Sequence, residues 1–358
     1  MAGLYVHIPF CKKRCNYCDF FSTTLLEHRK EYVQAVLNEI AKRKDETNDT
    51  IRTVYLGGGT PSTLEIDDIS RILDAIDLTK TEEITMELNP GDATSDYLRS
   101  LRSIGINRLS IGIQSFQDTL LQIAGRRHTA QQAIDAVRMA QEAKFENISI
   151  DLMYALPTQS MNEWKEDIET ALHLDVQHIS SYGLIYEHGT ALTQRVQAGE
   201  LKAIDEEEEN AMYDYLCQRL KEAGFMHYEV SNFARPGYES KHNNSYWDGT
   251  PYIGIGAGAH SYVNDVRSWN PNDLSAYIHG IQTNTLVREK ETLTETDLYN
   301  ERIMLGLRTS RGVARTYIKG DVCAHIKAEL LQETEDGRIV ATQKGLHILN
   351  RIIEDLML

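Results

Sequence analysis

The first half of the chain alternates short apolar runs with amphipathic segments, and this alternation limits the folds open to it. The runs have the length and composition of β-strands, and the segments between them repeat apolar residues at helical spacing. Strands separated by helices pair in parallel through right-handed crossovers. We therefore predict an α/β fold, a partial TIM-like (β/α)6 barrel, with an open doubly wound sheet as the alternative. The predicted strands are Leu4–Ile8, Thr53–Leu56, Glu83–Leu88, Arg108–Ile113, Ile148–Met153 and His178–Leu184, and the predicted helices are 28–45, 67–77, 94–104, 130–144 and 161–174.

The alternation fades near residue 204, which suggests a division of the chain. We predict a barrel over 1–204, a connecting region over 205–285 and a small, mainly helical C-terminal domain over 286–358. The connecting region starts with a helix whose first turn is acidic, which favours the helix dipole and needs no further function. A loop-rich section over 231–275 follows it. The C-terminal domain has a winged-helix-like pattern, but its acidity argues against DNA binding.

Composition excludes several classes of function. The chain has 358 residues and a formal net charge of -16, which argues against general affinity for nucleic acid or anionic membranes. No apolar run approaches the roughly 18 to 20 residues that span a bilayer. The amino terminus lacks the basic and long apolar regions of a signal peptide. We expect a cytoplasmic protein without a transmembrane segment.

The chemically distinctive residues fall where the predicted strands end. Three cysteines follow the first strand, Gly57-Gly-Gly59 follows the second, and Glu87 lies near the end of the third. Gln114 ends the fourth strand, and Asp151 lies late in the fifth. Barrels and doubly wound sheets both place their sites at the carboxyl ends of the strands. We therefore expect these residues to share one rim.

The cysteines of this rim are Cys11, Cys15 and Cys18, in a C-x-x-x-C-x-x-C run. Such a run suits three irons of a 4Fe–4S cluster and leaves the fourth iron without a protein ligand. A structural zinc site would need a fourth ligand, and Cys217 and Cys323 are distant in sequence. Three clustered cysteines cannot pair evenly as disulfides. The spacing alone leaves a cluster site and a chance grouping equally open.

Two glycine-rich strings invite comparison with nucleotide-binding motifs, and neither matches one. Gly57-Gly-Gly59 lets backbone amides approach a ligand or makes a tight turn, but the P-loop pattern is absent. Gly254, Gly256 and Gly258 have the spacing G-x-G-x-G, whereas the Rossmann fingerprint is G-x-G-x-x-G. Close packing of the chain suffices to explain the second string.

Other polar residues suit two kinds of ligand. Glu87, Gln114, Arg126 and Asp151 could hydrogen-bond a zwitterionic, ribose-bearing molecule, and a structural polar network at the barrel mouth is the alternative. The string His242-Asn-Asn-Ser-Tyr-Trp247 offers a histidine that could ligate haem iron beside aromatic faces. Taken alone, this string is more typical of a loop with buried aromatic residues.

Together these motifs resemble the radical S-adenosylmethionine (radical SAM) superfamily, in the branch of oxygen-independent coproporphyrinogen III dehydrogenase and its haem-chaperone relatives. The resemblance implies that Cys11, Cys15 and Cys18 hold a 4Fe–4S cluster whose open iron binds S-adenosylmethionine (SAM). The motif positions that imply SAM contacts are Tyr5, Gly58, Gly59, Thr60, Glu87, Gln114, Arg126 and Asp151. The strings that carry the resemblance are Tyr5-Val-His-Ile-Pro-Phe-Cys11, the cysteine run, Gly57-Gly-Gly-Thr-Pro61, Glu87-Leu-Asn-Pro90, Ile111-Gly-Ile-Gln-Ser115 and Asp151-Leu-Met-Tyr154.

Where this chain departs from the dehydrogenase pattern, the resemblance to the haem chaperones is favoured over the resemblance to the dehydrogenase. The dehydrogenase has a fourth cysteine where this chain has Phe20, and it has an amino-terminal extension before its first strand. The string from His242 to Trp247 fits the H-N-x-x-Y-W signature of the chaperones. The resemblance then implies haem as cargo, with His242, Tyr246 and Trp247 as haem contacts, and no catalytic residue is assigned.

The resemblance further implies haem-requiring membrane proteins as acceptors, peripheral membrane association through them, and a cluster-linked homodimer. Two alternatives differ in kind. One is radical oxidative decarboxylation of coproporphyrinogen III in porphyrin metabolism. The other is an inert scaffold whose cysteines bind zinc.

Overall fold

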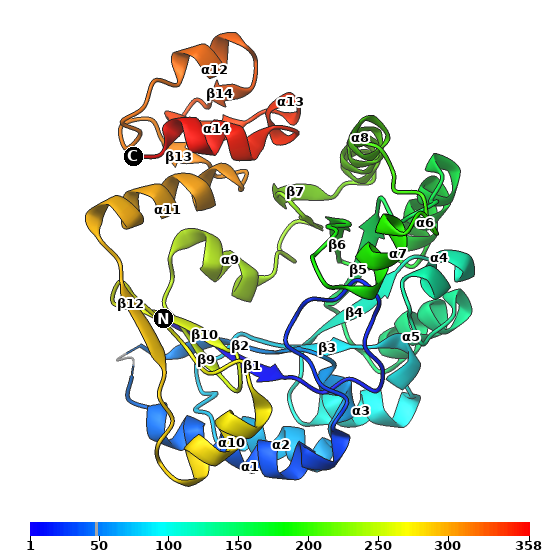
Figure 1. The fold of residues 1–358 in the computed structure, drawn as a ribbon, viewed down its shortest axis with the longest axis vertical. Coiled ribbons are helices and arrows are strands. Elements are labelled where there is room, and N and C mark those ends of the chain that lie inside the picture. Colours follow the sequence, from blue (N-terminus) through cyan, green and yellow to red (C-terminus); the bar gives the residue numbers. More distant parts are fainter. Residues whose placement is uncertain (47–48) are drawn as a thin grey trace.

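The computed structural model describes residues 1–46 and 49–358, and a curved twelve-stranded sheet forms its centre (Figure 1). Strands β1 to β6 are parallel neighbours in chain order, which confirms the incomplete α/β barrel. The sheet order is β12-β11-β10-β9-β1-β2-β3-β4-β5-β6-β8-β7. The strands are β1 (Ala2–Ile8), β2 (Ile51–Gly58), β3 (Glu83–Leu88), β4 (Arg108–Gln114), β5 (Ile148–Tyr154), β6 (His178–Gly183), β7 (Met226–Glu229), β8 (Asn232–Ala234), β9 (Tyr252–Ile255), β10 (His260–Val263), β11 (Val266–Trp269) and β12 (Glu289–Thr292).

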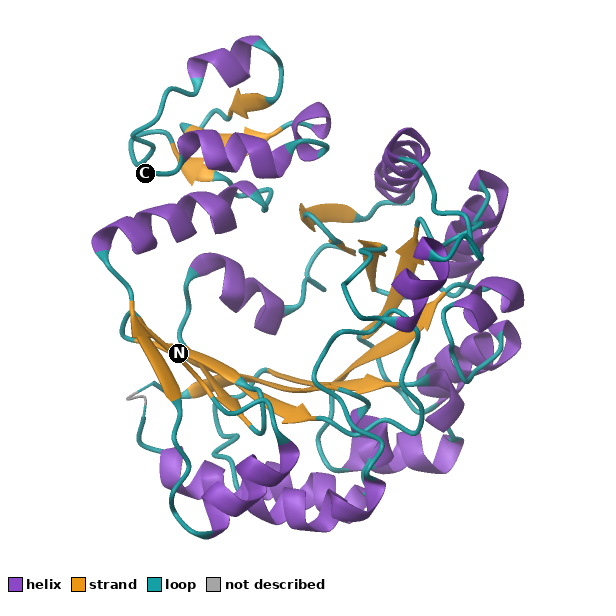
Figure 2. Ribbon diagram, in the orientation of Figure 1, coloured by secondary structure: helices purple, strands orange, loops and turns teal. Residues whose placement is uncertain are grey.

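Helices cover the convex side of this sheet, as Figure 2 shows. The five predicted helices of the first half are present as α1, α2, α3, α5 and α6, and two short ones, α4 and α7, were not predicted. The helices are α1 (Arg29–Arg43), α2 (Ile66–Asp74), α3 (Ser95–Ser103), α4 (Asp118–Ile123), α5 (Ala130–Glu142), α6 (Met161–His173), α7 (Ala191–Gln197), α8 (Glu206–Glu222), α9 (Lys241–Asp248) and α10 (Leu274–Gln282), with 3-10 turns η1 (Leu26–His28), η2 (Pro61–Thr63) and η3 (Pro90–Asp92).

The two faces of each parallel strand have different chemistry. In β4, Leu109, Ile111 and Ile113 are fully buried in the main hydrophobic core. The alternate residue Ser110 donates a hydrogen bond to Asp151 Oδ1 on β5 (3.1 Å). Successive strand side chains point to opposite faces. Apolar side chains therefore hold the helices on the convex face, and the concave face carries polar ones.

The section expected to be loop-rich, 231–275, is instead mostly regular structure, so that expectation is wrong. The string from His242 to Trp247 lies in helix α9, on the concave side of the sheet (Figure 1). Ser240 caps this helix by accepting a hydrogen bond from the Asn243 amide (3.2 Å). The side chain of Glu83 accepts bonds from the amides of Lys241 (3.1 Å) and His242 (3.0 Å). A carboxylate at a helix amino terminus satisfies free N–H groups and the helix dipole.

The G-x-G-x-G string serves close packing, as its spacing suggested. Strand β9 pairs in parallel with β1, so the string adjoins the first strand of the barrel. A Cβ on Gly256, whose φ is +105°, would lie 2.4 Å from Tyr32 Oη. A Cβ on Gly254 would lie 2.0 Å from the carbonyl oxygen of His260. Neither position has room for a side chain.

The carboxyl-terminal residues form a second hydrophobic cluster. Their helices surround a small sheet of order β13-β15-β14 and contact the rest of the chain through α9 and α8. The predicted division at residues 204 and 285 stays a prediction. No helix within the described residues is long and apolar enough to span a membrane. The elements are α11 (Glu295–Leu307), β13 (Val313–Ala314), α12 (Cys323–Lys327), β14 (Leu331–Glu333), β15 (Arg338–Ala341), α13 (Gln343–Leu346) and α14 (Leu349–Leu356).

Candidate functional site

The three clustered cysteines lie in one loop that leaves and rejoins the carboxyl end of β1. The Cys11 amide donates to the Thr23 carbonyl (2.8 Å), and the Thr23 amide donates to the Pro9 carbonyl (2.7 Å). These bonds close the base of the loop 11–22, which we call the cysteine loop. It lies over the carboxyl ends of the parallel strands, where its dark blue trace is visible in Figure 1.

Two anchors fix the cysteine loop to other parts of the barrel rim. Asn16 donates from its backbone amide to the Ala124 carbonyl (2.9 Å) and from Nδ2 to the Ile123 carbonyl (2.8 Å). On another side, Lys12 Nζ donates to Asp92 Oδ1 (2.7 Å). Asp92 Oδ2 also accepts bonds from Arg127 (2.9 Å) and Ser62 (3.0 Å). Because the Asp92 side chain is only 3% exposed, it joins three segments of the rim at a poorly hydrated point.

The cysteine thiols themselves contact the polar residues of the rim. Cys11 Sγ lies 3.4 Å from Thr60 Oγ1, and Arg126 Nη1 donates to Cys15 Sγ at 3.3 Å. Burial raises the pKa of the Cys18 thiol to about 11 and raises that of Cys11 as well. The free thiols of Cys11 and Cys18 are therefore protonated at neutral pH, and a metal or cluster that binds them must displace protons.

The cysteine loop fits an iron–sulfur cluster by its donor set. It carries three soft thiol ligands, and its neighbour Arg126 is a partly buried cation that suits an anionic cluster. The Nε of Arg126 is buried without a hydrogen-bond partner. Within the part of the chain that the structure describes, no three His, Cys, Asp or Glu side chains already lie close enough to hold one metal ion. The fit therefore rests on ligand chemistry and loop position.

The glycines at the carboxyl end of β2 are explained by packing against β1 and the residues that follow it. Gly58 has a φ of +114°, and a Cβ there would lie 2.5 Å from the His7 ring. A Cβ on Gly59 would lie 2.7 Å from the Pro9 backbone. Only glycine fits these positions, so their close approach to a ligand is an additional role that stays a prediction.

Glu87 is a partly buried carboxyl group on the concave side of this rim. It accepts hydrogen bonds from Tyr55 Oη (2.9 Å) and from the Gly58 amide (3.1 Å). Burial, together with the nearby charge of Asp151, raises the pKa of Glu87 to about 7. Burial also raises the pKa of Asp151. At neutral pH, small electrostatic changes therefore alter how far Glu87 is ionised.

Gln114 occupies a strained position at the end of β4. Its φ is +73°, which is unusual for a residue with a side chain, and the pairing of β4 with β5 is irregular between Gly112 and Gln114. The carbonyl of Gly112 accepts a hydrogen bond from Arg126 Nη2. Backbone strain of this kind is concentrated at functional sites. The structure thus brings Gln114, Arg126 and Asp151 to the same rim as the cysteines.

The predicted haem contacts lie elsewhere, on the concave face below this rim. His242 is 1% exposed, with Nδ1 hydrogen-bonded to Thr53 Oγ1 (2.8 Å) and Nε2 to Tyr246 Oη (2.9 Å). Burial lowers the pKa of His242 to about 3, and Arg108 adds to this effect. Both ring nitrogens are therefore engaged, and neither is free for haem iron in this arrangement. Trp247 is partly exposed on the same helix.

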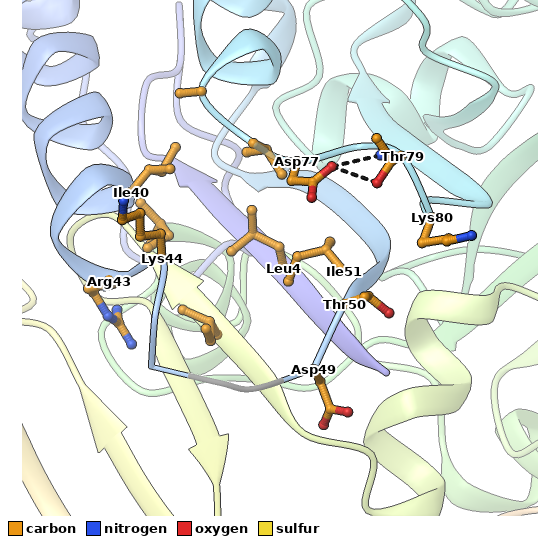
Figure 3. Close-up of a pocket in the computed structure, with 14 residues that line it drawn as sticks. Leu4, Ile40, Arg43, Lys44, Asp49, Thr50, Ile51, Asp77, Thr79 and Lys80 are labelled. Atoms are coloured by element: carbon orange, nitrogen blue, oxygen red, sulfur yellow. Dashed lines mark hydrogen bonds between the residues drawn. The ribbon is translucent and has the colours of Figure 1, made fainter.

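A pocket of about 220 Å³ lies at the opposite ends of the strands and is distinct from this rim (Figure 3). Leu4 and Ile51, near the starts of β1 and β2, line it together with Ile253. Lys44 and Lys80 stand at its edge. The pocket thus adjoins none of the residues that the motifs singled out.

Three rim or interior residues were not singled out by the motifs. They are Asp92, Arg108 and Tyr17, and Tyr17 lies close to Arg126. Asp92 follows the Glu87-Leu-Asn-Pro90 string by two residues, and the sequence offers no sign of its three partners. Arg108 begins β4, and only the structure shows that it is fully buried.

Comparisons with known proteins define the class. Residues 5–171 match the radical SAM superfamily. The fold is similar to that of coproporphyrinogen III oxidase (HemN) from Escherichia coli, with a TM-score of 0.85 and 22% sequence identity, over 99% of this chain and 90% of that one. The chain is therefore a radical SAM protein with the fold seen in HemN.

Curated relatives define the family more narrowly. The chain is 37% identical to the haem chaperone HemW of Lactococcus lactis, over 99% of this chain and 97% of the relative. It is 36% identical to HemW of Bacillus subtilis, over 88% of this chain and 85% of that relative. The chain belongs to the HemW family.

Proposed function

We propose that this chain is a haem chaperone, which binds haem and delivers it to haem-requiring proteins on a scaffold that carries a 4Fe–4S cluster and SAM. The observation that carries the proposal is the similarity to HemW relatives over nearly the whole chain. Phe20, which stands where the dehydrogenase has a cysteine, agrees with it. The likeness to HemN concerns the fold and does not distinguish cargo binding from turnover.

In this proposal, Cys11, Cys15 and Cys18 hold the cluster, and the anchors at Asn16 and Asp92 keep the cysteine loop against the barrel. A bound cluster supplies electron transfer, and one iron without a protein ligand can bind SAM. Arg126 contributes a positive charge beside Cys15. Cys11, at the base of the loop, is buried, whereas Cys15 and Cys18 are partly exposed.

The remaining rim residues are proposed to hold SAM. Glu87 and Asp151 can accept hydrogen bonds from ribose hydroxyls when they are ionised, and Gln114 presents an amide from a fixed backbone position. The other proposed contacts are Tyr5, Gly58, Gly59, Thr60 and Arg126. Tyr5 lies beside this group, with its ring centroid 6.1 Å from that of Tyr55.

Haem is proposed to bind near helix α9, with Trp247 as its most accessible aromatic contact. A ring nitrogen of His242 can ligate iron only if its bond to Thr53 or to Tyr246 is broken. The hydroxyl of Tyr246 is likewise engaged, in its bond to His242. We further propose a cytoplasmic location, membrane haem proteins as acceptors and a cluster-linked homodimer.

A paired anaerobic assay tests the proposed function. Protein with a reconstituted cluster is titrated with haem, and separate samples receive coproporphyrinogen III, SAM and a reductant. The proposal expects stoichiometric haem binding without conversion of the porphyrinogen. Formation of protoporphyrinogen would instead identify the oxidative decarboxylation, and protein that carries zinc without sulfide would support the inert scaffold.

A further inference from the structure

Arg108 is a buried cation that forms no ion pair with any residue that the structure describes. Its side chain is 1% exposed and is among the largest that are fully buried. Throughout the described ranges 1–46 and 49–358, no carboxylate lies within ion-pairing distance of it, and no acceptor receives its hydrogen bonds. Its Nε is buried and unpaired. Burial of a charge without compensation is costly, so a guanidinium in this position calls for an explanation.

The side chain faces the concave interior of the barrel. Arg108 and Ser110 alternate with the core residue Leu109, and Ser110 reaches Asp151 inside the barrel. Thr85, the partner of Arg108 in register on β3, has a buried hydroxyl that is also unpaired. The neighbouring ring nitrogens of His178 and His242 are all hydrogen-bonded to other groups. The lower layer of the barrel thus holds Arg108 without neutralising it.

Two partly buried carboxyl groups lie one layer above, toward the rim. In parallel register, Glu87 is opposite Ser110, and Gly112 is opposite Asp151. Arg108 opposes the rise that burial causes in the pKa of both carboxyl groups. Neither carboxylate forms an ion pair with a described residue, so the effect of Arg108 acts through space.

Other groups face these carboxyl groups from the surrounding elements. Tyrosines from four elements lie near Glu87, and two serine hydroxyls lie near Asp151. Among the charged groups, Arg126 acts on Asp151 from the rim, and Glu87 and Asp151 act on each other. The remaining neighbours are Tyr5 on β1, Tyr55 on β2, Tyr182 and Ser180 on β6, Ser110 on β4 and Tyr246 on α9.

We propose that Arg108 is a positioning residue of the SAM site, whose through-space charge keeps Glu87 and Asp151 ionised so that they accept hydrogen bonds from the ligand. This inference rests on the proposed placement of SAM against Glu87 and Asp151. Arg108 does not itself touch SAM. Its unpaired state follows from this role, because a direct ion pair would occupy the carboxylate oxygens.

The test compares Arg108→Met, which removes the charge, with Arg108→Lys, which keeps it. SAM affinity of the cluster-loaded proteins is measured from pH 6 to pH 9, with iron and sulfide content recorded for each. A rise of one unit in a pKa near 7 lowers the ionised fraction at pH 7 about fivefold. Arg108→Met should therefore bind SAM about fivefold to tenfold more weakly at pH 7 and approach wild-type affinity at pH 9. Arg108→Lys should keep the wild-type pH midpoint.

The alternative outcomes separate the inference from the proposed function. If the wild type binds no SAM at any pH, the proposed SAM site is wrong. If the wild type binds SAM and Arg108→Met loses affinity equally at all pH values, Arg108 is merely structural and the inference is overturned. Should Arg108→Met fail to fold, Arg108→Lys decides: a raised midpoint in that variant contradicts the inference, and an unchanged midpoint supports it.

Discussion

Replacement of His242 by alanine should destabilise the protein strongly and leave haem binding largely intact. The ring of His242 links α9 to the sheet, because it hydrogen-bonds Thr53 on β2 and Tyr246 on α9. The substitution would leave both hydroxyls without this partner in a buried place. Each orphaned group costs about 1–3 kcal/mol, and the lost ring leaves a cavity. We expect the free energy of unfolding to fall by about 3–5 kcal/mol.

Denaturant unfolding monitored by tryptophan fluorescence measures this loss, and His188→Ala provides a matched control. His188 is exposed and has no hydrogen bond or ion pair to any described residue, so its replacement should change stability by less than about 0.5 kcal/mol. Haem titration and the haem spectrum complete the comparison. A His242→Ala protein that keeps wild-type stability but loses haem or its spectrum would refute the reasoning and make His242 a haem ligand.

Three further predictions address packing, the cysteine loop and pH. Gly256→Ala should destabilise by about 3 kcal/mol or more, because its Cβ meets a buried hydroxyl, whereas Gly249→Ala, which meets nothing within 4 Å, should cost about 1 kcal/mol in thermal unfolding. Asp92→Asn should weaken the anchors of the cysteine loop and lower the iron and sulfide retained after reconstitution, while Asp96→Asn on the exposed surface should not. Burial lowers the pKa of His242 to about 3, so as the pH falls below about 6.5 this histidine is protonated in the unfolded state before it is protonated in the folded state. The free energy of unfolding should therefore fall by up to about 1.4 kcal/mol per pH unit until the pH reaches about 3. Urea titrations from pH 7 to pH 5 should show a shallower decline in His242→Gln.

The sequence predicted the parallel strands well because their signal is local. Glu83–Leu88 has the predicted bounds, and β4 and β5 extend only one residue beyond theirs. Each is a short apolar run between turn residues, and parallel strands buried on a helix-covered face need such runs. The rim followed from the same pattern, since the carboxyl ends of parallel strands meet at one edge of the sheet.

Helix α9 could not be predicted because its stabilisation is not local. Its Asn243, Asn244 and Ser245 favour turns over helix interiors, so the string reads as a loop. In the structure, Glu83 from β3 binds the first amides of the helix, and His242 packs into the barrel. Tertiary contacts therefore override local preference here.

The isolation of Arg108 was likewise invisible in the sequence. A lone arginine at the start of an apolar strand is commonly a charged residue that reaches solvent at the strand end. Only the three-dimensional arrangement shows that its side chain turns inward and finds no carboxylate. The three partners of Asp92 are hidden from the sequence for the same reason.

Electron paramagnetic resonance of the anaerobically reconstituted, reduced protein tests the central claim most directly. With three thiol ligands and one open iron, the protein should show a 4Fe–4S signal that changes when SAM is added, and Cys15→Ser should abolish it while Cys323→Ser, at an exposed cysteine far from the rim, should not. A wild-type protein that takes up iron and sulfide but gives the same spectrum with and without SAM would contradict an open iron at this rim. A protein that takes up neither would contradict the cluster itself.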